Sequence, residues 1–219
     1  MKKFFAIALS AALLLIGTQA NAQLSIGAGY LNSNESTTIG SSDPSTTNYN
    51  GAYAGFNYNI PIVAGLGIAP GFYASWLTKT NADGGSLGPI KVSGKSAYNE
   101  IALNVPVNVN YSIDLARDTK VFLYAGPIFQ YGVMSQTSAE GGASWGDFKF
   151  DTGTKSINNY DADNGSRNPF NIYIGGGAGI NVAGIQVIVG YDHSLMNGAK
   201  SEDVKIGRSQ IKVGVGYSF

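Results

Sequence analysis

The residues of this 219-residue chain that could do chemistry are a few charged side chains on strand-like segments. Glu100, Asp192 and Lys212 each lie in an alternating stretch, in the phase whose other members are small or polar, and Arg208 and Lys79 lie near stretch ends. Because successive side chains of a strand point to opposite faces, these residues face one interior. There, a carboxylate beside Lys or Arg would form a desolvated ion-pair network. We expect a polar network of Glu100, Asp192, Lys212 and Arg208 that plugs the interior, and a gate or narrow conductance path is the functional alternative.

Two further motifs match known sites only in part. An EF-hand calcium loop has Gly at its sixth position and Glu six residues later. In Asp161–Gly165, the glycine comes fifth, and Asn171, six residues after it, is not an acid. We predict an Asx-type turn there rather than a metal site. Gly175–Gly177 lies within a strand pattern and precedes no helix, so it is not a phosphate-binding loop. We predict that these glycines relieve crowding in the lumen or against an aromatic neighbour. No catalytic residue, metal site or cofactor is expected.

The element that organises the chain is its last one, Gln210–Phe219. Apolar and polar or small residues alternate strictly along it, which predicts a strand with two different faces. Seven earlier segments show related patterns, and all eight predicted strands are 24–32, 50–60, 67–79, 96–111, 119–134, 169–182, 185–195 and 210–219. The chain has no cysteine, so disulfides cannot hold these strands together.

The connections between these strands alternate in length. Polar stretches at 33–49, 80–95, 135–168 and 197–207 are long, whereas the links near 61–66, 114–118 and 183–184 are short. Membrane barrels of bacteria combine an even strand number with short turns at one end and longer loops at the other. In lipid, every backbone group needs an internal partner, so the strands must close into a ring. We therefore predict an all-β fold, an eight-stranded antiparallel up-and-down transmembrane β-barrel.

The composition of the two faces favours the same fold. The phase opposite the apolar residues holds mainly Gly, Ser, Asn and Gln rather than the Lys and Glu of a solvated surface. Small, uncharged side chains suit the narrow lumen of an eight-stranded barrel. Pro70, Pro106 and Pro127 fall inside strands, and because proline removes a ladder donor, we expect a bulge or a strand end at each.

The N-terminus predicts export. Lys2 and Lys3 precede the apolar run 4–16, and Ala20-Asn21-Ala22 fits a signal-peptidase site. We predict a cleaved signal peptide at 1–22 and one barrel domain at 23–219. Removing the two lysines leaves 12 basic residues (14 − 2) against 14 acidic ones. This balance gives no support to nucleic-acid binding, which needs a clustered basic surface.

Several segments resemble a known family. YNEIALNVPVNVNY (98–111), VFLYAGPIFQYG (121–132) and the stretch IGGGAGINV…VGYDHSL (174–195) are similar to the outer-membrane β-barrel domain family common in Bacteroidetes, the porin family or PorT-like proteins. The architecture also resembles small OmpA- and OmpX-like barrels. The resemblance implies a monomer in the outer membrane of a Gram-negative bacterium, in contact with outer-membrane lipid. The ending Tyr217-Ser218-Phe219 resembles the signal that the barrel-assembly machinery reads in this class.

The resemblance implies a structural, adhesion or surface-binding role through external loops near 33–49 and 135–168. A narrow porin-like channel for small solutes is the alternative, and a lipid A-modifying enzyme is a third class. A lipid A deacylase family with this fold uses an outward His and Ser two residues apart. Here Ser194 is adjacent to His193, so their side chains point to opposite faces. We therefore expect no enzyme and interpret His193 as an interfacial residue at the rim.

Overall fold

The fold follows from the alternating pattern carried by almost every segment of the chain. The computed structural model describes residues 23–145 and 148–219, so the predicted signal peptide at 1–22 lies outside the described residues. The described residues form nine strands: β1 (Gln23–Ile39), β2 (Ser45–Val63), β3 (Leu66–Leu87), β4 (Ile90–Ala116), β5 (Thr119–Trp145), β6 (Phe148–Asn158), β7 (Phe170–Val182), β8 (Ile185–Ser194) and β9 (Val204–Ser218).

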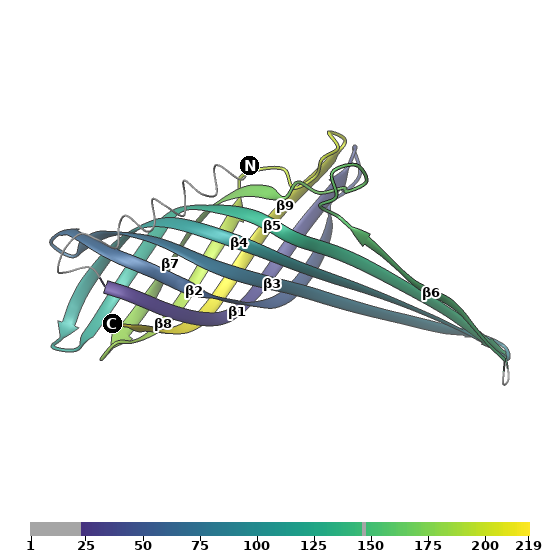
Figure 1. Cartoon of the computed structure of the whole chain (residues 1–219), viewed down its shortest axis with the longest axis horizontal. Helices are drawn as coiled ribbons and strands as arrows, with labels where there is room; N and C mark the ends of the chain where they lie inside the picture. The colour runs from purple at the N-terminus through teal and green to yellow at the C-terminus, as the bar shows by residue number, and fades with distance from the viewer. Residues whose placement is uncertain (1–22, 146–147) are drawn as a thin grey trace.

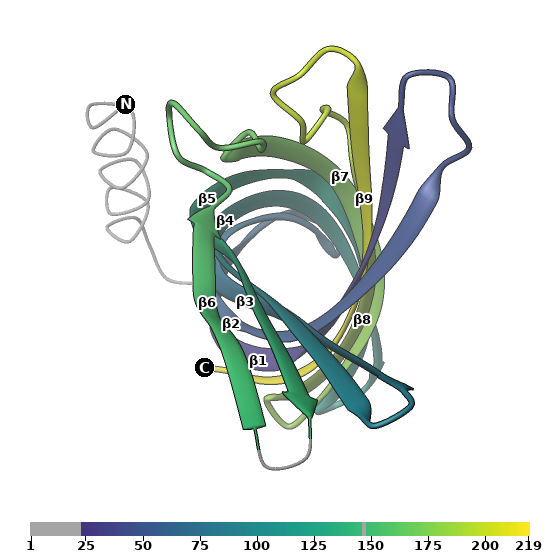
Figure 2. The same ribbon diagram turned by 90° about the vertical axis from the view of Figure 1, so that its right-hand side faces the viewer.

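Eight of these described strands close a ring. Each pairs antiparallel with its neighbours in the order β1, β2, β3, β4, β5, β7, β8, β9, and β9 returns to β1. The last ladder runs from Ser25 opposite Ser218 to Ile39 opposite Val204. Figure 2 looks into the ring from one end of the molecule. The predicted eight-stranded antiparallel up-and-down barrel is confirmed, and β6 is a ninth strand that pairs with the far part of β5.

The long polar stretches are mostly strands, which corrects the prediction of long loops. β1 and β2 are joined by 40–44 alone, and β3 and β4 continue as a hairpin to Leu87 and Ile90. The stretch 135–168 holds the end of β5, all of β6 and all but the last residue of the loop 159–169. Most of β6 and of the far parts of β3, β4 and β5 is exposed on both faces, so a long apolar alternation is not needed there and the sequence is typical of a loop. The predicted tight turns are found at 64–65, 117–118 and 183–184.

A four-stranded sheet extends beyond the ring. It consists of the far parts of β3, β4 and β5 together with β6 (79–87, 90–99, 136–145 and 148–158), and we call it the projecting sheet. Figure 1 shows it running away from the barrel and tapering to a narrow end. The barrel end nearest to this sheet is the loop end. The opposite end carries the three tight turns, and we call it the turn end; Phe219 donates its backbone N–H to Leu24 there.

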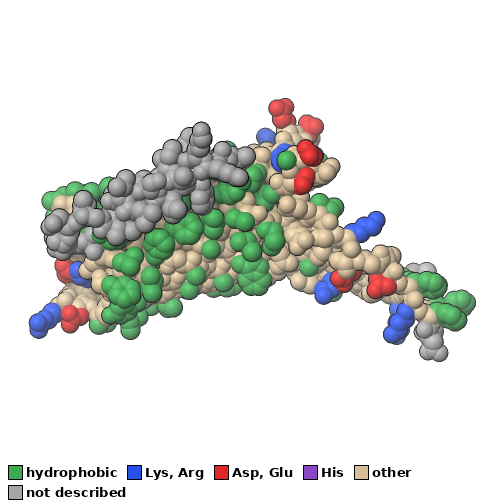
Figure 3. All heavy atoms as spheres, in the orientation of Figure 1, with side chains coloured by type: hydrophobic (Ala, Val, Ile, Leu, Met, Phe, Trp, Pro, Cys, Tyr) green, Lys and Arg blue, Asp and Glu red, His purple; other side chains and the backbone are tan. Residues whose placement is uncertain are grey.

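The outer surface of the ring is apolar. Outward side chains of all eight ring strands are exposed and apolar, among them Ile26, Tyr30, Phe56, Trp76, Ile101, Val109, Leu123, Phe129, Ile174, Val189, Ile211 and Val215. Figure 3 shows hydrophobic side chains over the barrel, with charged groups at its ends and on the projecting sheet. No helix within 23–145 or 148–219 is long and apolar enough to cross a membrane. An apolar outside and a polar inside is the pattern of a transmembrane barrel.

Glycine and proline positions show how the wall is packed. A Cβ on Gly190 would lie 2.3 Å from the hydroxyl of Tyr124, so glycine leaves room for that ring inside the lumen. Gly177 lies beside the same ring, in agreement with the prediction that the glycines at 175–177 relieve crowding within their strand. The proline prediction is wrong: Pro70, Pro106 and Pro127 occupy neither bulges nor strand ends. The ladders near them skip pairs without a change of register, because proline lacks the N–H that a ladder bond needs.

Candidate functional site

The candidate site is a cluster of ionised side chains inside the loop-end half of the lumen. Glu35 on β1 accepts hydrogen bonds from Arg167 Nη1 and Nη2, both at 2.6 Å, and from Arg208 Nη2 at 2.7 Å. Glu100 on β4 accepts from Arg208 Nη1 at 2.7 Å and Nη2 at 3.1 Å. We call these four residues the charge cluster. Its two carboxylates and two guanidinium groups balance, and such paired, hydrogen-bonded charges are the kind that a buried site tolerates.

The charge cluster crosses the lumen. Arg208 lies on β9 and Glu100 on β4, and in the ring order three strands, β1, β2 and β3, separate them on one side. Three others, β5, β7 and β8, separate them on the other, so the two residues come from opposite walls. The pair is nearly inaccessible, with Glu100 only 1% and Arg208 6% exposed. Arg208 therefore links opposite sides of the barrel through its interior.

Two tyrosine rings surround the guanidinium groups. Tyr49 and Tyr98 have ring centroids 4.7 Å apart. Arg167 lies over the Tyr98 ring at 5.3 Å, and Arg208 lies over the Tyr49 ring at 5.8 Å. The Tyr98 hydroxyl donates to Glu100 and accepts from Ser135 at 3.1 Å. These contacts fix both arginines by cation–π attraction as well as by ion pairing.

A chain of uncharged hydrogen-bonding groups, which we call the amide chain, lies beside the charge cluster. The Tyr173 hydroxyl donates to Gln130 at 3.2 Å, and Gln130 donates to Asn104 at 2.9 Å. Asn104 in turn donates to Ser75 at 2.9 Å. This chain joins β7, β5, β4 and β3 across half of the ring. Its members are buried, so the lumen at this level is filled by side chains.

A second ion pair lies nearer the turn end. Lys212 Nζ on β9 is 2.7 Å from Asp192 Oδ2 on β8, and it lies 5.1 Å from the Tyr73 ring centroid. Lys212 follows Arg208 by four residues on the same face of β9, which corresponds to about 13 Å of strand. The four predicted network residues therefore form two separate pairs, Glu100 with Arg208 and Asp192 with Lys212, rather than one network.

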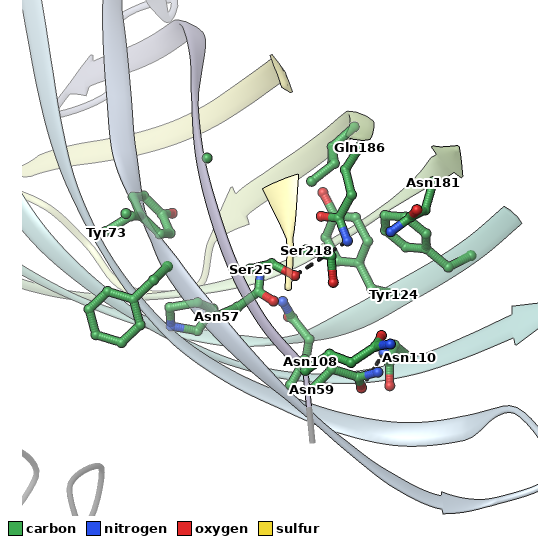
Figure 4. Close-up of a pocket in the computed structure, with 18 of the residues that line it drawn as sticks. Ser25, Asn57, Asn59, Tyr73, Asn108, Asn110, Tyr124, Asn181, Gln186 and Ser218 are labelled. Atoms are coloured by element: carbon green, nitrogen blue, oxygen red, sulfur yellow. Dashed lines mark hydrogen bonds between the residues drawn. The ribbon is translucent and has the colours of Figure 1, made fainter. Parts of the chain in front are cut away.

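Beyond Lys212 the lumen opens into a cavity of about 160 Å³ toward the turn end. Its wall is rich in amides, of which Asn57, Asn59, Asn108, Asn110, Asn181 and Gln186 are labelled in Figure 4. Asn110 donates to Asn59 at 2.8 Å, and Gln186 donates to Ser25 at 3.3 Å. We call this space the vestibule. The charge cluster, the amide chain and the Lys212–Asp192 pair all lie between it and the loop end.

The loop 159–169 covers the loop end of the lumen. Its Arg167 side chain reaches inward to the charge cluster, and its backbone pairs with Ala199 in the 195–203 loop. Asp161 accepts hydrogen bonds from the backbone N–H groups of Asp163 and Asn164, which lower the pKa of its carboxyl group. This is the predicted Asx-type turn. Within the described residues, no group of three or more His, Cys, Asp or Glu side chains could hold a metal ion.

Sequence reasoning missed half of the charge cluster. Glu35 was assigned to a loop because the apolar alternation of β1 ends near Asn32, although its inward phase continues through Ser33. Arg167 comes from a true loop, and no periodicity predicts where its side chain lies. Lys79, predicted near a strand end, lies instead where β3 enters the projecting sheet. Glu35 could have been found by extending the period of β1.

His193 and Ser194 do point to opposite faces. Ser194 is buried and accepts a hydrogen bond from the backbone N–H of Arg208 at 2.7 Å. His193 faces outward, and its Nδ1 lies 2.9 Å from the hydroxyl of Ser209 on β9. This outward pair was not predicted, because it depends on the register between β8 and β9.

The predicted assembly residues lie at the turn end. Tyr217 and Phe219 are both exposed, and their ring centroids are 5.1 Å apart in an edge-to-face arrangement. Tyr217 pairs with Ile26 of β1 and Ile185 of β8. Their outward position leaves both rings accessible from outside the barrel wall.

Comparison with known proteins gives likenesses in structure only. No family model matches the chain, and no curated protein matches it. Similar solved structures include Ail of Yersinia pestis in complex with the heparin analogue sucrose octasulfate (15% identity, 91% of this chain and 100% of that chain, TM-score 0.38). Others are Neisserial surface protein A (13%, 91% and 100%, 0.36) and the outer membrane enzyme PagL (12%, 89% and 98%, 0.41). The barrel assignment rests on strand pairing, and the resemblance to PorT-like proteins stays a prediction.

Proposed function

We propose that this protein is an integral barrel of the outer membrane of a Gram-negative bacterium that displays the projecting sheet for surface binding. The observation that carries the proposal is the sheet itself, whose four strands reach well past the apolar surface of the ring. A structure that only filled the membrane would not need strands of 27 residues such as β4 and β5. In this proposal the binding element is a paired sheet, whereas the sequence led us to expect external loops near 33–49 and 135–168.

The contents of the lumen favour an anchor over the alternative of a narrow channel. The charge cluster links opposite walls, and the amide chain fills space beside it. The barrel then serves as a stiff base for the sheet, because β3, β4 and β5 are continuous between the two. Outer-membrane lipid and the barrel-assembly machinery are the partners that this role implies, the latter through Tyr217 and Phe219.

Membrane fractionation with a heat-shift gel tests the barrel, and cysteine labelling tests the display of the sheet. We expect outer-membrane protein whose mobility changes only after boiling. The chain contains no cysteine, so Lys91→Cys introduces a single label site on the projecting sheet, and Arg117→Cys introduces one in a turn-end turn. A membrane-impermeant maleimide on whole cells should label the first variant and spare the second. The reverse pattern would invert the orientation and refute the proposal.

The His193–Ser209 pair supports a second candidate function, a surface enzyme acting on lipid. The two groups lie 2.9 Å apart on the outward face near the loop end, where a hydroxyl activated by an imidazole would meet the outer leaflet. Comparing the lipid A of cells that express the wild type or His193→Ala tests it. An acyl pattern that changes with the wild type alone would establish the enzyme, and identical patterns would remove it.

A further inference from the structure

The end of the projecting sheet has an ordered arrangement of apolar and basic residues. In the outermost row of paired residues, Ile90 lies opposite Trp145, and Trp145 lies opposite Phe148. In the second row, Ser144 lies between Lys91 and Lys149, and in the third, Ala143 lies between Val92 and Phe150. We call these three rows the tip. Because rows alternate between faces, the apolar residues of the first and third rows share one face and the two lysines occupy the other.

The apolar face of the tip is uncovered. The exposed fractions are 62% for Trp145, 71% for Phe148 and 67% for Phe150. Ile90 and Val92 beside them are also exposed, at 43% and 53%. Five large apolar side chains gathered on one solvated face mark an interaction surface rather than the scattered exposure of an ordinary protein surface.

The position of the tip determines which surface it can meet. Ile90 precedes the lumenal Glu100 by ten residues of the same strand, which corresponds to about 33 Å. Figures 1 and 3 show the tip at the far end of the molecule, well separated from the apolar surface of the barrel. The tip therefore points away from the membrane that the barrel spans and toward whatever faces that membrane.

The dimensions and charge of the tip fit a lipid surface. Three rows span about 7 Å along the strands. Interfacial segments bury their apolar side chains about 5–10 Å deep, with tryptophan at the headgroup level and lysines beside anionic headgroups. Among the described residues of the tip, the charged ones are Lys91 and Lys149, and Asp147 is outside the described residues. The nearest described acid is Asp151, one row farther back.

We propose that the tip inserts into a second lipid bilayer, one with anionic headgroups, that faces the bilayer holding the barrel. The proposal rests on the proposed function, because it requires the sheet to stand outside the cell. A tapered end made of two hairpins offers no groove for a helix, whereas a fluid bilayer adapts to it. Trp145 and the two phenylalanines enter the acyl boundary, and Lys91 and Lys149 contact phosphate and carboxylate headgroups.

The chain provides its own reporter for this insertion. Its two tryptophans are Trp76, on the outer surface of the barrel, and Trp145. Trp76→Phe leaves Trp145 as the sole emitter. The protein is placed in phosphatidylcholine nanodiscs and mixed with vesicles of phosphatidylcholine, either pure or with about a third phosphatidylserine. We expect a blue shift and quenching by brominated acyl chains with the anionic vesicles only.

Matched variants separate charge from apolar contact. Lys91→Gln with Lys149→Gln should weaken binding to anionic vesicles roughly thirtyfold, the loss expected for two lysines at an anionic surface. Lys95→Gln with Lys155→Gln removes the same charge farther down the sheet and should leave binding within about twofold. Phe148→Ser with Phe150→Ser should abolish the Trp145 shift, whereas Ile157→Ser, exposed on the same strand, should preserve it.

Each remaining outcome overturns a defined part of the reasoning. A heat-shifted barrel whose Trp145 signal ignores both kinds of vesicle refutes lipid insertion and leaves the proposed function intact. Equal binding to neutral and anionic vesicles refutes the headgroup assignment. A blue shift that grows with protein concentration without vesicles shows that the occupant is a second copy of this chain. Loss of the heat shift in the wild type itself refutes the membrane barrel.

Discussion

Removing the Arg208 side chain should show what the charge cluster contributes to stability. In Arg208→Met, Glu35 keeps its two hydrogen bonds from Arg167, but Glu100 loses the guanidinium that donates to both of its oxygens. Glu100 is 1% exposed, so its charge stays buried without an ionic partner. Breaking a buried pair in this way costs about 3–5 kcal/mol, or a factor of roughly 10²–10⁴ in the folding equilibrium.

A double variant makes this prediction specific to charge. Glu100→Gln with Arg208→Met removes the orphaned carboxylate, so we expect the double variant to be about 2 kcal/mol more stable than Arg208→Met alone. Urea unfolding of the barrel in lipid vesicles measures both values. Lys205→Met, an exposed lysine of the same strand, should change stability by less than about 0.5 kcal/mol. A cost below about 1 kcal/mol for Arg208→Met, or a double variant less stable than the single, would refute the reasoning.

Three further predictions concern the wall, the lumen and the C-terminus. Gly190→Ala should lower the free energy of unfolding in urea by about 1–3 kcal/mol, because the added Cβ would meet the Tyr124 hydroxyl. Adding Tyr124→Phe should restore most of this loss. Gly207→Ala, whose Cβ meets nothing within 4 Å, should leave the stability unchanged. In planar bilayers the wild type should be silent, whereas Glu100→Ala with Arg208→Ala should show discrete openings; open wild-type channels would favour the channel alternative. Phe219→Ala should lower the amount of protein assembled in the outer membrane. The free energy of unfolding of the assembled barrels should stay within about 0.5 kcal/mol of the wild-type value, because the ring is exposed. A loss of stability that accompanies the loss of assembled protein would mean that Phe219 acts through stability.

The barrel could be predicted because the alternation of side chains that it requires is visible within each strand segment of the sequence. A strand with lipid outside and a narrow lumen inside needs alternation with period two, and β9 shows it from Ile211 to Tyr217. The tight turn at 183–184 is signalled by Gly184, whose φ of 88° is one that glycine adopts readily. These signals are local, so eight strands and three turns were found without knowledge of pairing.

The projecting sheet and the charge cluster could not be predicted in the same way. In β6 every residue is exposed, so no buried face imposes a period, and the mainly polar stretch after Phe150 is typical of a loop as well as of a strand. The pairing of Glu100 with Arg208 joins residues 108 positions apart, and it depends on ring closure rather than on phase. Phase predicted which residues face inward; register decides which of them touch.

The membership of the charge cluster also bears on the order of folding. Its residues come from the first strand, the fourth, the loop before β7 and the last strand, so Arg208 cannot meet Glu35 until the two ends of the chain have come together. The seam between β1 and β9 brings together residues as distant in sequence as Ser25 and Ser218, and contacts of such high sequence separation form slowly. An open, half-built sheet gains nothing from these ion pairs and has two unpaired edges. The ion pairs of the charge cluster thus form late in folding, and they make completion of the ring cooperative and slow its reopening.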